Sequence, residues 1–588
     1  MVLVLLSKVF NLLILVYEKI LLLACVIGLT SCFSSDDFLD PKTTALTEET
    51  VFSDSTRTIG FLYRIYSDIG FSYTKGRWDS HGNTEEATDD AEYRYSGTGQ
   101  KAVILYSGTV SPTNFPFFEF WSTPYNNIRR VNLLLEKLPN APLSAPMKAQ
   151  MVAEARFLRA WYYHWLLISF GGVPLVGDKV YDITDFINLP RNSYADCVNY
   201  LVKELDEAAT VLPKSADYSE QNYGKATRGA CLALKSRILL YAASPLFNGG
   251  AETQNADLAK IVSNPTYDVA HWQKAADAAL AVMNSGEYSL YKDNTTAPGY
   301  GFYQVFLNRV NPEFIIFQNR SANRDMEGFY NMPTRGGAYN AMPTQNLVDA
   351  FPMKNGKAIS DATSGYDPNN PYKNRDPRFE YSIVYNESMY YLASANAQRQ
   401  VLTYENAPSD GFTQAGQTTG YYSRKMCDAN ISANSSFTTN RGWSLMRYAE
   451  VLLNYAEAIN ETGKTDLAYA PLIALRDRAG ITAGDEKLYG LKANMTKEQM
   501  REIIRNERRV ELAFEDHRWN DIRRWKIAMD VSNGYNKRMR ITKNANNTYT
   551  YQVTESIRRH NFRPEMYLLP IPDSEVRKAP AMLQNPGW

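Results

Sequence analysis

Two stretches of this sequence concentrate the residue types that acid–base chemistry or ligand binding requires. Residues 76–95, GRWDSHGNTEEATDDAEYRY, combine several carboxylates with a tryptophan, a histidine and tyrosines. Residues 503–525, IIRNERRVELAFEDHRWNDIRRW, combine glutamates and arginines with a histidine and two tryptophans. Residues 76–95 could form a glycosidase centre, a calcium site or a sugar-binding site. The charges of residues 503–525 could either do chemistry or hold helices together.

Catalysis is the least favoured interpretation of residues 76–95. A glycoside hydrolase needs two carboxylates about 5 to 9.5 Å apart on opposite sides of a sugar, and Glu85, Glu86, Asp89 and Asp90 are the candidates. Neighbouring acids such as Asp89 and Asp90 are expected to point apart and meet solvent. A calcium loop is also disfavoured, because the D-x-[DN]-x-[DN]-G pattern is absent.

Sugar binding makes a simpler demand on the same residues. An aromatic ring must lie against the apolar face of a pyranose, and polar groups must bond its hydroxyls. Trp78 with Asp79, Asn83 and Arg94 meets this demand. These four residues are predicted to contact a ligand.

Residues 503–525 predict a single helix, because no proline or glycine interrupts them and large side chains recur at helical spacing. The recurring positions are Ile503, Glu507, Val510, Phe514, Asp521 and Trp525. Ion pairs three residues apart along this helix are expected for Arg508 with Glu511 and for Glu515 with Arg518. Glu507 lies in the apolar stripe and would need a cation from another helix if buried. Trp519 and Trp525 are expected to pack on residues 447–460 or on the C-terminal tail.

The elements that must position these residues are mainly helical. Helical periodicity and turn signals predict helices at 117–138 (interrupted at Pro124), 145–170, 194–211, 226–243, 269–284, 443–461 and 465–478. Short turns between successive helices predict tetratricopeptide-like stacked helical hairpins. The stretch 145–170 is expected to be deeply buried and to end at Gly171 and Gly172.

Long irregular loops interrupt these helices at residues 71–116, 286–345 and 352–442, which are rich in Gly, Asn, Ser, Thr, Pro and Tyr. A few short strands, such as FIIFQNR at 314–320, are expected within them. Loops longer than about 15 residues are uncommon in compact domains unless they serve a function. The loops are therefore predicted to carry the binding surface on a rigid helical scaffold.

The bulk composition excludes several classes of protein. Lys plus Arg equals Asp plus Glu at 63 each, so no net charge draws the chain to nucleic acid. The five cysteines, at 25, 32, 197, 231 and 427, lack metal-ligand spacing, and Cys197, Cys231 and Cys427 allow at most one disulfide. No phosphate-binding loop or Gly-x-Ser-x-Gly elbow is present. No catalytic residue, metal or cofactor is predicted, and His164 and His517 are expected to be structural.

The amino-terminal sequence has the pattern of an export signal. Lys19, the apolar run ILLLACVIGL and then LTSC match a lipoprotein signal peptide at residues 1–31, with Cys32 as the lipidated residue. The alternative is a transmembrane anchor at residues 2–29, which is long enough to cross a bilayer. That alternative would place Glu18 and Lys19 in the middle of the span at high cost.

Several segments together resemble the SusD/RagB family of outer-membrane nutrient-binding lipoproteins. They are AEARFLRAWYYHWLLISFGGVPLV at 153–176, RDPRF at 375–379, TGYYSRKM at 419–426, RYAEVLLNYAEAIN at 447–460, LIALRDRAGI at 472–481, IRNERRVELAFEDHRWNDIRRW at 504–525 and the closing YLLPIPDSEVRKAPAMLQNPGW. The resemblance covers nearly the whole mature chain, divided as an N-terminal region at 32–300 and a C-terminal region at 301–588.

The resemblance implies a helical, lipid-anchored protein at the cell surface that binds an oligosaccharide and caps a SusC-like TonB-dependent transporter in the outer membrane. Members of the family are binding proteins and not enzymes, and one subgroup is associated with peptide uptake. The family's glycan site uses loop aromatics, which in this sequence are Tyr300, Phe302, Tyr303, Tyr330 and Tyr339. A glycan ligand is expected, while a peptide ligand, a glycoside hydrolase and a scaffold for protein assembly remain alternatives.

Overall fold

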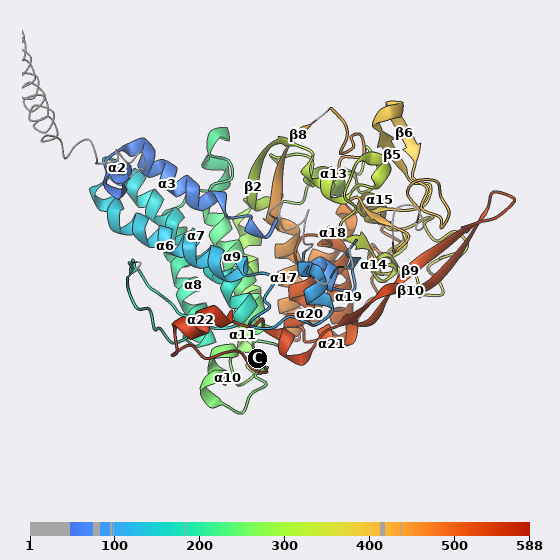
Figure 1. The fold of residues 1–588 in the computed structure, drawn as a ribbon. Helices are drawn as coiled ribbons and strands as arrows, with labels where there is room; N and C mark the ends of the chain where they lie inside the picture. Colours follow the sequence, from blue (N-terminus) through green and yellow to red (C-terminus); the bar gives the residue numbers. More distant parts are fainter. Residues whose placement is uncertain are drawn as a thin grey trace, which may run out of the picture.

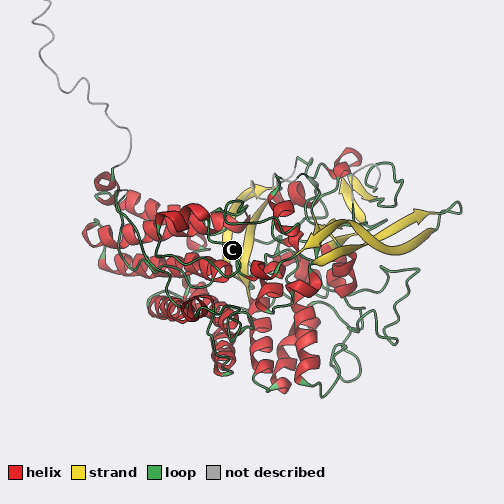
Figure 2. Cartoon of the chain, turned by 60° about the horizontal axis from the view of Figure 1, so that its bottom comes forward, coloured by secondary structure: helices red, strands yellow, loops and turns green. Residues whose placement is uncertain are grey.

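The computed structural model describes residues 47–73, 83–94, 97, 99–182, 184–411, 418–436 and 438–588. The predicted signal peptide, the predicted lipidation site Cys32 and the candidate ligand contacts Trp78 and Asp79 lie outside these ranges. The described chain places long helices on one side and loops with short strands on the other (Figure 1; Figure 2).

A series of long helices builds the helical side of the molecule. They are α6 (Glu119–Lys137), α7 (Ala145–Phe170), α8 (Tyr194–Ala209), α9 (Arg228–Ala243), α11 (Ala270–Ser285), α17 (Tyr448–Glu461) and α19 (Lys497–Glu511). Each helix in this series packs against the next one. The prediction of a mainly α fold with stacked helical hairpins is therefore confirmed.

Helix α7 is the central element of the first hairpins, and its predicted bounds are those observed. It is buried on nearly all sides from Phe157 to Phe170, because α3 (Ser55–Ser67), α6, α8 and α9 all pack on it. Buried polar atoms find partners here: Trp161 Nε1 donates to the Ile69 carbonyl at 3.0 Å. The helix ends where Gly171 adopts a φ of 80°, which a residue with a Cβ rarely does.

Two predicted helix boundaries are wrong. Pro124 lies inside α6 and does not interrupt it, because burial of Phe120 and Trp121 before it and Ile128 after it outweighs the lost hydrogen bond. The predicted helix at 443–461 begins as a strand, β8 (Thr439–Arg447), which pairs antiparallel with β2 (Phe314–Asn323). The segment FIIFQNR, predicted as a strand, lies in β2.

The strands described in this structure pair in twos and do not form a large sheet. The other pairs are β1 (Ala91–Glu92) with β3 (Met342–Pro343), β4 (Ile383–Val384) with β7 (Tyr422–Ser423), β5 (Met389–Leu392) with β6 (Ala397–Gln400), and β9 (Asn533–Lys543) with β10 (Tyr549–Asn561). The β9–β10 hairpin extends from the body at the right of Figure 1. The sequence analysis did not predict this hairpin.

Residues 503–525 do not form one helix. Helix α19 ends at Glu511, and α20 (Arg518–Arg524) begins after a turn in which Phe514 and Asp516 both adopt a φ of 62°. A left-handed conformation is costly for such residues and persists only where the surroundings enforce it. Here the turn directs Glu515 and the α20 arginines toward partners that a straight helix would not reach.

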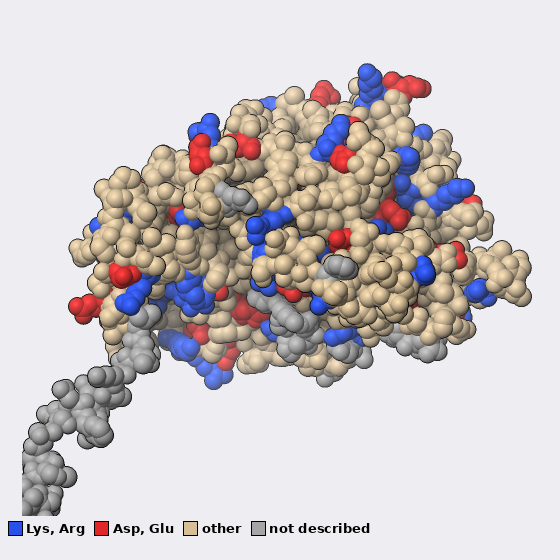
Figure 3. All heavy atoms as spheres, turned by 90° about the horizontal axis from the view of Figure 1, so that it is seen from above, with Lys and Arg blue, Asp and Glu red and all other residues tan. Residues whose placement is uncertain are grey.

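Shorter helices complete the described chain. They are α2 (Glu48–Phe52), α5 (Lys101–Tyr106), α10 (Ala256–Val262), α12 (Tyr300–Val305), α13 (Asp325–Tyr330), α14 (Gln345–Ala350), α15 (Pro377–Ser382), α18 (Tyr469–Arg478), α21 (Ala528–Val531) and α22 (Asp573–Lys578). None of the helices within the described ranges combines the length and apolarity needed to cross a bilayer. On the face seen in Figure 3, basic and acidic side chains are interspersed, in keeping with the neutral composition.

Candidate functional site

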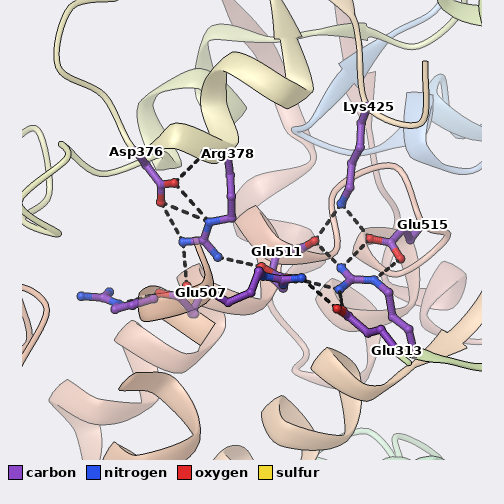
Figure 4. Close-up of polar contacts among 10 residues, drawn as sticks. Glu313, Asp376, Arg378, Lys425, Glu507, Glu511 and Glu515 are labelled. Carbon is purple, nitrogen blue, oxygen red and sulfur yellow. Dashed lines mark hydrogen bonds and ion pairs between the residues drawn. The ribbon is translucent and has the colours of Figure 1, made fainter. Parts of the chain in front are cut away.

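A buried ion cluster lies where the loops meet the C-terminal helices (Figure 4). It consists of five carboxylates, Glu313, Asp376, Glu507, Glu511 and Glu515, and five cations, Arg378, Lys425, Arg447, Arg476 and Arg478. All ten side chains are at most 4% exposed. Since buried charges are tolerated only when paired, the equal number of each sign makes the cluster possible.

Glu511 is the centre of this cluster. It accepts from Arg378 Nη1 at 2.8 Å and from Arg447 Nη1 at 2.7 Å, and it also pairs with Arg478. Burial alone would raise the pKa of Glu511, but the three guanidinium groups hold the pKa far below its usual range. Glu511 is therefore ionised across the physiological pH range. At Lys425 the effect of burial outweighs that of the neighbouring charge: burial lowers the pKa of Lys425 to about 8, although Glu515 opposes the shift.

The prediction for Glu507 is confirmed. Its carboxylate bonds Arg378 at 2.7 Å and Arg476 at 2.8 Å, both from other elements. The predicted ion pairs along residues 503–525 are wrong. Arg508 and Glu511 share α19 but pair with residues of other elements, and the helix breaks before Glu515. Arg508 instead bonds Asp521 at 2.8 Å, and Glu515 bonds Lys425 and Arg447 at 2.7 Å each. The charges of this stretch therefore join separate elements of the fold.

The two tryptophans lie as predicted. Trp525 Nε1 donates to Glu457 of α17 at 2.7 Å. Trp519 makes an edge contact with Phe562 in the C-terminal part of the chain, with ring centroids 5.7 Å apart. Burial would raise the pKa of Glu457, but Arg524 lowers it to about 2. Residues 503–525 thus clamp the helical layer to the C-terminal segment.

The acidic stretch at 83–92 is tied to the same clamp. Asp89 bonds Arg518 at 2.8 Å, and Asp90 bonds Arg509 at 2.6 Å. The expectation that these two acids meet solvent is wrong, since both are buried. Burial raises the pKa of Asp90, whereas Arg509 and Arg518 overcome burial at Asp89 and lower its pKa to about 2. These carboxylates anchor the loop in the body of the protein.

Glu86 joins this stretch to a second loop far along the chain. It accepts from the backbone N–H of Asn83 at 2.6 Å and from that of Ala341 at 2.8 Å. Strand pairing of β1 with β3 continues the connection. Asn83, a predicted ligand contact, is buried, and its side chain accepts from the backbone N–H of Glu85 at 2.9 Å. Asn83 therefore fixes the backbone at the start of the described residues 83–94.

Arg94 and Tyr339, two predicted site residues from distant parts of the chain, lie together, and Tyr300 and Tyr303 form a second contact within α12, with ring centroids 5.7 Å apart. The Arg94 guanidinium lies 5.6 Å from the centre of the Tyr339 ring, within the range of a cation–π contact. Arg94 also donates to the Ala338 carbonyl at 2.7 Å. Both side chains are half-buried, and Tyr339 has a φ of 41°. A half-buried aromatic beside a guanidinium offers a flat face and charged donors to a ligand.

The remaining predicted tyrosines lie apart from this pair. Tyr303 is nearly buried, stacks on Tyr381 and hydrogen-bonds Asp428 at 3.1 Å, while Tyr300 beside it is half-buried and Phe302 is buried. Tyr330 is fully buried against Phe514, with ring centroids 6.0 Å apart. Three of these aromatic side chains pack inside the protein in this structure: Phe302, Tyr303 and Tyr330. Ligand contact by Tyr300, Tyr303 or Tyr330 stays a prediction.

The described histidines and cysteines named in the sequence analysis are buried. Burial lowers the pKa of His164 and of His517 well below the usual value, so both rings are neutral. Cys197, Cys231 and Cys427 are buried free thiols without a disulfide. Within the described ranges, no group of three or more His, Cys, Asp and Glu side chains could hold a metal ion.

The sequence analysis missed the loop residues that complete the ion cluster. Glu313, Asp376, Arg378 and Lys425 come from segments predicted to be irregular and surface-exposed. A local signal existed for Glu313 alone, which directly precedes the apolar run FIIF. A charge inside an apolar segment indicates a buried partner.

Two family models match this chain. The sequence model described as the SusD family matches residues 312–588, and the one described as starch-binding associating with outer membrane matches residues 37–240. The chain belongs to the SusD/RagB family. A solved SusD-like protein from Bacteroides fragilis is 26% identical, with a TM-score of 0.75 over 92% of this chain and all of that one.

Other SusD/RagB relatives extend over similar lengths. The SusD-like protein P2 of Formosa agariphila is 24% identical over 514 residues, which are 85% of this chain and 86% of the relative. Surface glycan-binding protein A of Bacteroides fluxus is 20% identical, with a TM-score of 0.61 over 91% of this chain and all of that one. The second likeness is one of fold, and it agrees with the stacked hairpins described above.

Proposed function

We propose that this protein is a surface-exposed lipoprotein that binds a glycan and delivers it to a SusC-like TonB-dependent transporter in the outer membrane, without catalysing a reaction. Cys32 would carry the lipid anchor after removal of residues 1–31. The division of the mature protein into regions 32–300 and 301–588 belongs to the same proposal. The names of the outer-membrane starch-binding family model and of the surface glycan-binding protein support the class of ligand.

The observation that carries this proposal is the pairing of Arg94 with Tyr339. Glu86 joins the two loops that hold this pair, because its carboxylate accepts from the backbone N–H groups of Asn83 and Ala341. Trp78 and Asp79 precede Asn83 in the sequence by a few residues. A sugar ring needs an aromatic face and charged or amide groups around it. A ligand held by Trp78, Asp79, Arg94 and Tyr339 would therefore rest on loops that the buried charges keep in place.

Glycan binding is tested first on an array with the soluble form that starts after Cys32, and then by calorimetry with the glycan found. Trp78→Ala should weaken binding by at least about 1 kcal/mol if the ring stacks on a sugar. Tyr267→Ala is the matched control, because Tyr267 is 55% exposed and lies between α10 and α11. Equal affinity of the Trp78→Ala variant and the parent protein would remove Trp78 from the site.

The alternatives predict different results on the same samples. A peptide-binding member of the family would ignore the glycan array and bind a peptide library. A glycoside hydrolase would release products that substitution of Glu85, Glu86, Asp89 or Asp90 abolishes, whereas a binding protein would return the glycan intact. A scaffold for protein assembly would bind its partner regardless of sugar and of Trp78.

Anchoring is tested separately by Cys32→Ala. The variant should leave the membrane fraction, because no acyl chain would hold it. Membrane association that persists in the variant would favour a transmembrane anchor at residues 2–29.

A further inference from the structure

A groove opens on the helical side of the molecule. It has a volume of about 680 Å³ and lies between α6, residues 174–189 and α22. Phe118, Phe186 and Ile187 on its wall are 41%, 77% and 40% exposed. Large apolar side chains exposed together on a concave surface mark a docking site. We refer to it as the basic–aromatic groove.

The charges of the groove are unbalanced. Arg129, Lys179, Arg577 and Lys578 line it, against the carboxylates of Asp185 and Glu575. Arg577 and Lys578 pair with acids of their own helix. Arg129 donates to the Tyr181 carbonyl at 3.2 Å, and Lys179 lies 4.3 Å above the Tyr181 ring. Within the described ranges neither of these two cations is ion-paired with a carboxylate, so the groove favours an acidic occupant that also carries apolar side chains.

The sequence itself contains such a segment shortly before the first described residue. Residues 33–42, FSSDDFLDPK, combine Asp36, Asp37 and Asp40 with Phe33, Phe38 and Leu39. The described chain begins at Thr47, and the Glu48 carboxylate lies 3.8 Å from Lys137 Nζ at the end of α6. Arg129 lies about 12 Å from Lys137 along that helix at 1.5 Å per residue. Phe38 precedes Thr47 by nine residue positions, a length of chain that can span about 30 Å.

We propose that residues 33–42 dock in the basic–aromatic groove, with Phe38 among the exposed aromatic side chains and Asp36 and Asp37 beside Arg129 and Lys179. Docking of this segment does not depend on the proposed function. The orientation that docking would give the protein does depend on it: if Cys32 carries a lipid, the docked segment holds α6 and α22, at the left of Figure 1, toward the membrane. The loops that carry Arg94 and Tyr339 would then project away from the lipid.

The test is crosslinking within the full chain by a short bismaleimide. Phe38→Cys is combined with Ile187→Cys in the groove, or with Tyr63→Cys on α3 as the matched control. Ile187 is 40% exposed and Tyr63 is 46% exposed. Tyr63 lies on the helix that packs against α2, so both positions are within reach of the segment. The described native cysteines are buried. Docking predicts an intramolecular crosslink at least about tenfold faster at position 187, because docking raises the local concentration of the thiol.

Charge recognition is tested by reversal. Arg129→Glu with Lys179→Glu should abolish the preference for position 187, and adding Asp36→Lys with Asp37→Lys should restore it. Equal rates at positions 187 and 63, or a preference that survives the reversal, would overturn the proposal. Crosslinks between two chains would show that a second copy of the protein occupies the groove. Suppression of the crosslink by a bound glycan would show that the glycan occupies the groove. Both results contradict docking of residues 33–42. Loss of glycan binding with an intact crosslink would contradict only the proposed function.

Discussion

Replacing Glu511 by glutamine tests whether the buried ion cluster holds the loops to the helices. The substitution keeps the shape of the side chain and removes the charge that Arg378, Arg447 and Arg478 share. Each arginine keeps another carboxylate, since Asp376, Glu313 and Glu515 remain. The loss should therefore match the breaking of one buried ion pair, about 3–5 kcal/mol of unfolding free energy, and not the sum of three.

The assay is denaturant-induced unfolding followed by tryptophan fluorescence. Glu502→Gln is the matched control, because it makes the same chemical change on the same helix α19. The Glu502 side chain is 73% exposed and lies 3.6 Å from Arg505. Its loss should cost less than about 1 kcal/mol. If the two variants lost equal stability, the buried cluster would carry no more than a surface ion pair, and its role as the clamp of the loops would be refuted.

Three further predictions follow from the same contacts. The folded pKa of Glu457, about 2, lies below the usual 4.5. Ionised Glu457 therefore contributes about 3 kcal/mol to the free energy of unfolding above pH 4.5, and this stabilisation is lost as the pH falls toward 2. Glu457→Gln should flatten this part of a curve of stability against pH, and an unchanged curve would contradict the prediction. Arg518→Met should speed hydrogen exchange in residues 83–94, because Asp89 loses the bond at 2.8 Å, whereas Arg540→Met on the exposed hairpin, whose side chain is 50% exposed, should not. Glu507→Gln should lower stability and leave glycan affinity intact, since Arg378 and Arg476 lie far inside the protein; lost affinity with normal stability would contradict the separation of clamp from site.

The helical half of the fold could be predicted because its signals are local. Helix α7 carries its apolar periodicity, its first-turn Pro146 and its terminal Gly171 within one stretch of sequence, and its predicted bounds were those observed. The break at Phe514 could not be predicted in this way. Its left-handed backbone is imposed by partners of Glu515 and Arg518 that lie far away in the sequence.

The candidate site shows the same limit. Arg94 and the Tyr339 loop are 244 residues apart at their hydrogen bond, so no spacing rule relates them, and only the family resemblance indicated both regions. The buried state of Asp89 and Asp90 depends on Arg509 and Arg518, which lie more than 400 residues away. Local patterns describe an acidic surface loop there, whereas the tertiary partners turn it into an anchor.

The buried ion cluster has a consequence for the order in which the chain is made. Its carboxylates and cations run from Glu313 to Glu515, and they balance only when the last of them has joined. A polypeptide truncated before α19 would lack Glu507, Glu511 and Glu515 and leave Arg378, Lys425, Arg447, Arg476 and Arg478 with two carboxylates among them. Buried charges without partners are strongly destabilising. A chain that ends before α19 is therefore expected to be much less stable than the complete chain, because its buried cations would lack partners.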